Sequence, residues 1–131
     1  MKLGFTVGVW DLFHEGHLNF LKKCKNHCNY LFVGIMTDFW VRVQKGHDRP
    51  YHSLEKRICN LRESELADKI IILDTLDIHS YLQMVDVWIK GKEQKNMRPN
   101  MWVNEIFIER TPNISTTELL KQIRKPTEDE V

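Results

Sequence analysis

The feature that most constrains the fold is a continuous apolar run at residues 30–36, Tyr-Leu-Phe-Val-Gly-Ile-Met. A strand with apolar residues on both faces is typical of a parallel sheet that helices cover on both sides. The run is far shorter than the roughly 20 apolar residues that a membrane-spanning helix needs. The sequence therefore predicts a buried parallel sheet.

Strand-like and helix-like patterns alternate around this run. Strands are predicted at residues 3–9, 30–36, 69–73, 85–89 and 102–108, and helices at residues 17–28, 78–84 and 116–124, with one more helix opening after Ser53. Residues 39–51 are interpreted as a loop with a short helical start at most. This alternation predicts an α/β fold, Rossmann-like and three-layered (α/β/α), with a five-stranded, mostly parallel sheet. Residues 1–125 are expected to form one domain, and residues 126–131 an acidic C-terminal tail.

The composition fits one compact domain and excludes several classes of protein. The 131 residues are 42% apolar and 28% charged. Nineteen Lys and Arg residues against eighteen Asp and Glu residues give a formal net charge of +1, which argues against broad electrostatic binding to nucleic acid or membranes. The first five residues enter a strand pattern without the layout of a signal peptide, so we expect a cytoplasmic protein.

The three cysteines, Cys24, Cys28 and Cys59, cannot all pair with one another. Cys24 and Cys28 share a helix face, but too few further ligands lie nearby to complete a tetrahedral metal site. A free cysteine usually packs as a small apolar residue. We therefore expect reduced, structural thiols and no protein-bound metal.

A candidate phosphate site follows the first predicted strand, in the segment Gly-Val-Trp-Asp-Leu-Phe-His-Glu-Gly-His at residues 8–17. His14 and His17 lie three residues apart at the start of a helix, so they point to the same side. The free N–H groups of a helix N-terminus attract anions, and Gly16 lets a phosphate approach closely. Paired imidazoles there suit the developing charge of phosphoryl transfer. Metal ligation and plain surface histidines are the alternatives.

Two other segments carry groups suited to phosphate. Residues 110–118 begin with Arg110 and hold three consecutive hydroxyls before the last predicted helix. Ser115 or Thr116 can cap that helix, with Glu118 completing a capping box, and the same hydroxyls can hold a polyphosphate. Residues 44–49 include Lys45 and Arg49 in a loop that either closes over a nucleotide or is solvated surface.

These motifs resemble the cytidylyltransferase family of the HxGH nucleotidyltransferases, and within it most of all the glycerol-3-phosphate cytidylyltransferases. The similarity rests on the spacing GxxDxxHxGH at residues 8–17 and RTxxISTT at residues 110–117. Residues 33–38, 45–46 and 51–57 are also similar to the family's second strand, lysine loop and following helix. The resemblance runs from about residue 3 to residue 125.

The resemblance implies that an acceptor phosphate attacks the α-phosphorus of a nucleoside triphosphate and releases pyrophosphate. It implies that His14 and His17 stabilise the transition state, that Lys45 neutralises the reacting phosphates and that Arg110 grips the β- and γ-phosphates. Mg²⁺ would accompany the nucleotide, and the protein would form a homodimer. The expected nucleotide-binding residues are Gly8, Val9, Trp10, Asp11 (as a loop-orienting group), Gly16, Lys90, Gly91, Glu93, Ile114, Ser115, Thr116 and Thr117, and the expected acceptor-binding residues are Arg49, Arg57 and Arg62. The positive charge of the site is expected to come from His14, His17, Lys45 and Arg110.

Departures from the family pattern keep the substrates open. Val9 and Trp10 stand where Thr or Ser-like and Phe residues are common. Residues 90–93, Lys-Gly-Lys-Glu, are similar to the Lys-Gly-x-acid turn of related adenylyltransferases. Glu65 replaces the usual arginine before Asp68, and Arg62 is its nearest substitute. We expect CTP and a polyol or sugar phosphate; ATP with a sugar phosphate or FMN, and a non-catalytic nucleotide-binding module, are the alternatives.

Overall fold

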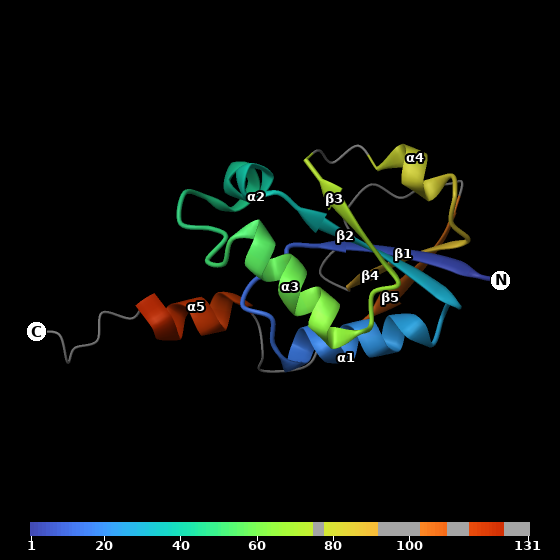
Figure 1. Ribbon diagram of the computed structural model, residues 1–131, viewed down its shortest axis with the longest axis horizontal. Helices are drawn as coiled ribbons and strands as arrows, with labels where there is room; N and C mark the ends of the chain where they lie inside the picture. Colours follow the sequence, from blue (N-terminus) through green and yellow to red (C-terminus); the bar gives the residue numbers. More distant parts are fainter. Residues whose placement is uncertain (75–77, 92–102, 110–115, 125–131) are drawn as a thin grey trace, which may run out of the picture.

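The computed structural model describes residues 1–74, 78–91, 103–109 and 116–124, with the backbone alone at residues 117, 118, 122 and 124. The elements in chain order are β1 (Leu3–Gly8), α1 (Glu15–Lys25), β2 (Tyr30–Met36), α2 (Asp38–Lys45), α3 (Leu54–Ser64), β3 (Lys69–Leu73), α4 (His79–Leu82), β4 (Val87–Gly91), β5 (Asn104–Ile108) and α5 (Thr116–Arg124). Figure 1 shows the strands as one twisted sheet with helices above and below it.

The sheet has the strand order β3-β2-β1-β4-β5, and the four pairs of neighbouring strands are all parallel. The predicted α/β class is confirmed. The chain first builds outward from β1 through β2 to β3, and then returns to the other side of β1 to add β4 and β5. In open parallel sheets, ligands bind beyond the carboxyl ends of the strands where the order reverses. Here that place lies after β1 and β4.

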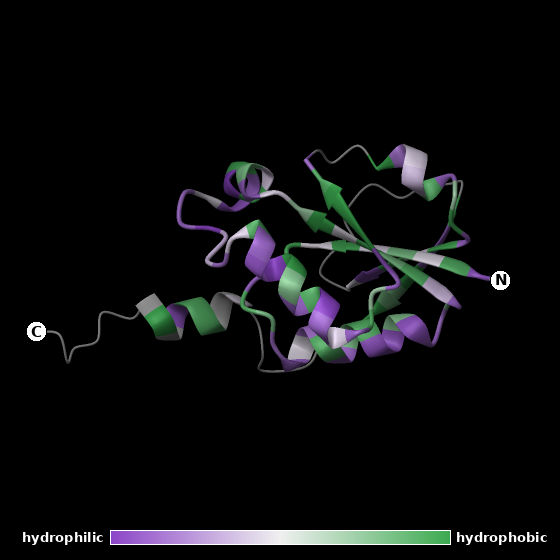
Figure 2. Cartoon of the chain, viewed as in Figure 1, coloured by the Kyte–Doolittle hydropathy of each residue, from purple (hydrophilic) through white to green (hydrophobic). Residues whose placement is uncertain are grey.

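Each face of the sheet has its own apolar core. On one face, Leu21 and Cys24 of α1 and Leu61 of α3 pack against the sheet. On the other face, Val41 of α2 and Leu82 of α4 do the same. Figure 2 shows hydrophobic colours concentrated along the strands and hydrophilic colours on the outer sides of α1 and α3. The architecture is therefore the predicted three-layer sandwich.

Residues 39–51 begin with a longer helical segment than the predicted short helical start, because helix α2 extends to Lys45. Thr37 caps this helix, and its Oγ1 accepts a hydrogen bond from the backbone N of Trp40 (3.3 Å). Asp38 places a negative charge in the first turn, which favours the positive end of the helix dipole. Gly46 ends the helix with φ of 105°, and the loop begins only there.

Strand β4 lies two residues later than predicted, at residues 87–91 instead of 85–89, and a charged residue is buried inside it. The Lys90 Nζ atom donates to Glu105 Oε2 on the neighbouring β5 at 2.8 Å, and lies 3.9 Å from the ring centroid of Trp88. An ion pair and an aromatic face together stabilise a buried ammonium group. The sequence pattern ends the predicted strand at residue 89, before Gly91. A lysine inside the strand is unusual, because lysine is rarely found fully buried.

The three cysteines lie in different surroundings. Cys24 is buried, Cys28 is half-buried and Cys59 is exposed, and all three are free thiols. Burial raises the pKa of the Cys24 thiol above its usual range.

Within the described ranges, no helix combines the length and the apolar character needed to cross a membrane. The predicted acidic tail at residues 126–131 lies outside the described residues.

Candidate functional site

The loop that joins β1 to α1 makes an unusually tight turn. Trp10 and Leu12 both adopt left-handed backbone conformations, with φ of 60° and 48°. Such conformations are unfavourable for residues other than glycine and persist where neighbouring contacts hold them. The turn carries the chain from the carboxyl end of β1 directly into the N-terminus of α1, where the two histidines lie.

His14 and His17 form a reciprocal cap at the N-terminus of α1. The backbone N of Gly16 donates to His14 Nδ1 (3.0 Å), and the backbone N of His14 donates to His17 Nδ1 (3.2 Å). These hydrogen bonds assign the single proton of each neutral imidazole to Nε2, because an accepting Nδ1 carries none. The two rings stack with their centroids 3.9 Å apart. The pair therefore presents two Nε2–H donors at a helix N-terminus.

The surroundings of His17 do not agree with the expectation that it carries positive charge. Burial, and secondarily the nearby His14, lower the pKa of His17 from its ordinary 6.5 to about 3. The rings of Trp10 and Phe13, with centroids 5.5 Å and 5.2 Å from that of His17, help to exclude water from it. His17 is therefore a neutral hydrogen-bond donor near pH 7.

Thr116 joins the second motif to the histidine pair. Its Oγ1 donates to the backbone O of Asp11 (2.9 Å) and lies 3.5 Å from His14 Nε2, at the outer limit of a hydrogen bond. Because the hydroxyl proton goes to Asp11, the Thr116 oxygen acts as acceptor towards His14. The structure thus brings the start of α5 to the loop after β1, although the two segments lie about a hundred residues apart in the chain.

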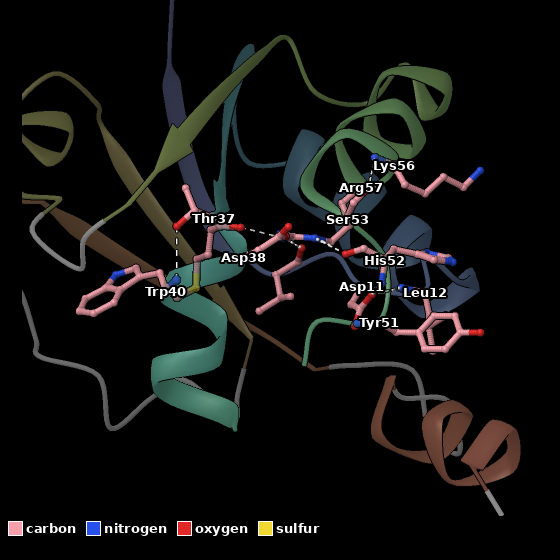
Figure 3. A network of polar contacts seen from close by, with 12 residues as sticks. Asp11, Leu12, Thr37, Asp38, Trp40, Tyr51, His52, Ser53, Lys56 and Arg57 are labelled. Carbon is pink, nitrogen blue, oxygen red and sulfur yellow. Dashed lines mark hydrogen bonds and ion pairs between the residues drawn. The ribbon is translucent and has the colours of Figure 1, made fainter. Parts of the chain in front are cut away.

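Asp11 is almost completely buried and holds a second loop in place. Its Oδ1 accepts from the backbone N atoms of Leu12 (3.0 Å) and His52 (2.8 Å), and its Oδ2 accepts from that of Tyr51 (2.7 Å). Figure 3 shows this carboxylate between the loop after β1 and the segment that leads into α3. With three N–H groups bound to it, Asp11 orients the loop.

Arg57 corrects the prediction of an acceptor-binding residue. Its side chain has 0% exposure, so its guanidinium faces other protein groups instead of a ligand. It donates to the backbone O atoms of Val9 (2.8 Å), Met36 (2.7 Å) and His52 (3.1 Å), and to Asp38 Oδ1 (2.6 Å). As Figure 3 shows, this one group lies among segments from β1, β2, α2 and α3. Arg57 is therefore a structural centre of the site.

The other predicted basic residues fall in three settings. Lys45 is exposed at the C-terminal end of α2, and Arg49 is half-buried in the loop that follows. Arg62 is exposed in the last turn of α3. Helix α3 begins at Leu54, and Arg62 lies roughly 12 Å from Leu54 along the helix axis. Lys90 has 1% exposure and its ammonium group is paired with Glu105, so its side chain is buried within the sheet.

The remaining predicted residues divide by position. Gly8 and Gly91 lie at the carboxyl ends of β1 and β4, Val9 directly follows β1, and Gly16 is buried in the first turn of α1. Arg110, Ile114, Ser115 and Glu93 lie outside the described residues, and Thr117 is described by its backbone alone.

The sequence pattern does not reveal the roles of Asp38, Tyr51 and His52. Asp38 binds Arg57, and the backbone N atoms of Tyr51 and His52 bind Asp11. Asp38 follows a buried strand and lies at the carboxyl edge of the sheet, which is the one signal that could have singled it out. Tyr51 and His52 take part through their backbones, so their side-chain types carry no such signal.

The loss of the Arg57 guanidinium should destabilise the whole protein. We expect Arg57→Met to lower the free energy of unfolding by about 3–5 kcal/mol, because it leaves a carboxylate and buried carbonyl groups without a donor. Arg62→Met, on an exposed position of the same helix, should change it by less than about 0.5 kcal/mol. Urea unfolding curves measure both, and equal effects of the two substitutions would contradict the assigned role.

The lowered pKa of His17 should appear in the pH dependence of stability. Between about pH 6.5 and pH 3 the unfolded chain binds a proton at this histidine that the folded chain does not, so the free energy of unfolding falls as the pH falls. From pH 6.5 to pH 4.5 this contribution is on the order of 2 kcal/mol. His17→Gln should lack it, so unfolding at a series of pH values should give a shallower dependence for the variant. Parallel curves would show that burial does not hold His17 neutral.

Comparisons with known proteins agree with one another. A family model described as Cytidylyltransferase-like matches residues 5–122. The glycerol-3-phosphate cytidylyltransferase of Bacillus spizizenii (strain ATCC 23059 / NRRL B-14472 / W23) is 31% identical over 94% of this chain and 98% of its own length. The bifunctional protein HldE of Campylobacter jejuni (strain RM1221) is 30% identical over 94% of this chain, which spans 28% of that longer protein.

Solved structures show the same fold. A lipopolysaccharide core biosynthesis protein from Thermoplasma volcanium GSS1 superposes with a TM-score of 0.72 at 22% identity, over 85% of this chain and 98% of that one. A bifunctional NMN adenylyltransferase/ADP ribose pyrophosphatase from Francisella tularensis superposes with a TM-score of 0.66 at 15% identity, over 95% of this chain and 42% of that one.

Proposed function

The chain belongs to the cytidylyltransferase-like family, and from that premise we propose that it joins CMP from CTP to a small phosphorylated acceptor and releases pyrophosphate. The acceptor class is glycerol 3-phosphate or a related polyol or sugar phosphate. The near full-length similarity to a glycerol-3-phosphate cytidylyltransferase supports this choice.

The observation that carries the proposal is the stacked histidine pair at the N-terminus of α1, beside Thr116 of α5. Phosphate oxygens are acceptors, and the pair offers Nε2–H donors next to the positive end of a helix dipole. These donors are held by the backbone before any ligand binds, so little reorganisation is needed when charge develops in the transition state.

The reaction needs no side-chain nucleophile. An oxygen of the acceptor phosphate attacks the α-phosphorus, and the bond from that phosphorus to the oxygen of the leaving pyrophosphate breaks, carrying its electron pair to pyrophosphate. His14 and His17 donate hydrogen bonds to phosphate oxygens, and we propose that Lys45 and Arg110 supply positive charge. Mg²⁺ would enter with the nucleotide, bound by its phosphates, and would neutralise part of their charge.

ATP is the second candidate nucleotide. The observation that favours it is the Lys90-Gly91 pair at the carboxyl end of β4, which is similar to the Lys-Gly-x-acid turn of related adenylyltransferases. In that case the acceptor would be a sugar phosphate or FMN. We also propose a homodimer that works in the cytoplasm, and light scattering of the purified protein tests its oligomeric state.

Pyrophosphate release tests the proposal directly. The protein is incubated with Mg²⁺, each nucleoside triphosphate in turn and a panel of polyol phosphates, sugar phosphates and FMN. We expect the fastest release with CTP and a polyol or sugar phosphate; faster release with ATP would support the second candidate. No release with any pair would contradict both and favour a non-catalytic nucleotide-binding module.

His17→Ala should lower kcat by at least ~10²-fold, because it removes a donor that stabilises charge in the transition state. Lys22→Ala, at an exposed position of the same helix, should leave kcat within about two-fold of the original protein. Both variants are assayed below their unfolding temperatures. Near-normal turnover in His17→Ala would exclude the proposed role of this imidazole.

A further inference from the structure

Trp10 occupies a strained position and is anchored there by its side chain. Its backbone is left-handed, with φ of 60°, and the residue is 4% exposed. The indole Nε1–H donates a buried hydrogen bond of 2.9 Å to the backbone O of Gly34, in the middle of β2. This hydrogen bond connects the loop after β1 to the neighbouring strand β2.

The adjoining strand leaves room for the indole. A Cβ atom at Gly8 would lie 2.9 Å from Cε2 of Trp10, closer than real Cβ contacts, and 3.1 Å from Cζ2, tighter than most of them. The ring therefore lies against the backbone of the last residue of β1. Gly8 permits this contact because it has no side chain, and the indole is held close to the sheet.

The indole also contacts His17. The ring centroids of Trp10 and His17 are 5.5 Å apart with an interplanar angle of 61°, an edge-to-face contact. His17 also stacks on Phe13 (5.2 Å, 16°) and on His14 (3.9 Å, 26°). Of these three neighbouring rings, the indole is the one hydrogen-bonded to the central sheet.

We propose that Trp10 is a positioning residue for phosphoryl transfer. Its tethered indole fixes the plane of the His17 imidazole relative to the carboxyl ends of β1 and β2, so that Nε2–H meets a phosphate oxygen without rearrangement. The proposal rests on the proposed function in one respect, that the ligand of His17 is a polyphosphate. A tryptophan that only filled the core would affect stability and leave the imidazole unchanged.

Trp10→Phe separates the tether from the filling of space, because it keeps an aromatic ring and removes the N–H donor. We expect kcat to fall by about ten-fold or more while KM changes by less than about three-fold. Phe20→Leu is the matched control. The ring centroid of Phe20, on α1, lies 6.2 Å from that of Trp10, and Phe20 is not one of the three rings around His17. That control should keep kcat within about two-fold.

Nitrogen-15 NMR of the imidazoles at pH 7 reports the tautomer of His17, which would not change if Trp10 only stabilised the fold. In the original protein, His17 should show a protonated Nε2 and a bare Nδ1, and added inorganic pyrophosphate should shift the Nε2 signal. In Trp10→Phe, the two nitrogens should move towards averaged tautomer positions, and the shift caused by pyrophosphate should shrink. An unchanged His17 spectrum together with an unchanged kcat would overturn the proposal, even if the variant were less stable.

A second substitution covers the case in which Trp10→Phe does not fold. Site-specific replacement of Trp10 by 3-benzothienylalanine keeps the shape of the indole and removes only the N–H group, and the same changes are expected. The NMR arm uses pyrophosphate alone and needs no turnover. If no nucleotide and acceptor pair reacts, the proposed function fails, while the spectra still decide whether Trp10 positions His17.

Discussion

The hydrogen bonds of the buried Arg57 guanidinium are the interaction on which the rest of the site depends. They join the backbone after β1, the carboxyl end of β2, the start of α2 through Asp38 and the segment before α3. A planar group with five donors can bind several segments at once, which an ammonium group on a flexible stem does less well. Asp11 binds the same segment before α3 through backbone N–H groups. A buried cation and a buried anion thus align the loops at the carboxyl edge of the sheet.

The histidine pair is built on this framework, and its chemistry follows from its surroundings. Stacked rings exclude water from His17, and the backbone of α1 uses Nδ1 of both imidazoles. Each imidazole keeps an Nε2–H donor at a helix N-terminus, and that of His14 lies 3.5 Å from the accepting Thr116 Oγ1. Neutral donors bind phosphate through direction and dipole, so the net positive charge that phosphoryl transfer requires must come from elsewhere. We therefore propose that the two histidines fix the position of the phosphate oxygens and that Lys45 and Arg110 supply the positive charge.

Much of the fold could be predicted from the sequence, because its strongest signals are local. Apolar runs placed β2 and β3 at the observed bounds, and the cluster of hydroxyls followed by a helical pattern placed α5. The spacing of His14 and His17 at a strand-to-helix turn predicted the pair that the structure brings together. Helix α2 was predicted only as a short helical start to a loop, because an eight-residue helix leaves a weak pattern and Gly46 and Pro50 indicated a loop.

The errors share one physical cause, the burial of charge. The family resemblance implied ligand contacts for Arg57 and Lys90, but both side chains are buried against partners that lie far away in the sequence or on another strand. Such burial is rare for charged residues. The charge of His17 was misjudged for the same reason, because its pKa depends on rings packed around it in three dimensions. Such environments are set by tertiary packing, and a pattern of residue types does not reveal them.

The most direct test of this account is the structure of the protein with bound CTP. We predict that the Nε2 atoms of His14 and His17 both lie within about 2.7–3.2 Å of triphosphate oxygens, with Arg57 and Asp11 keeping their present partners. A triphosphate bound away from the histidine pair, or an Arg57 side chain that leaves the sheet to contact the ligand, would contradict it.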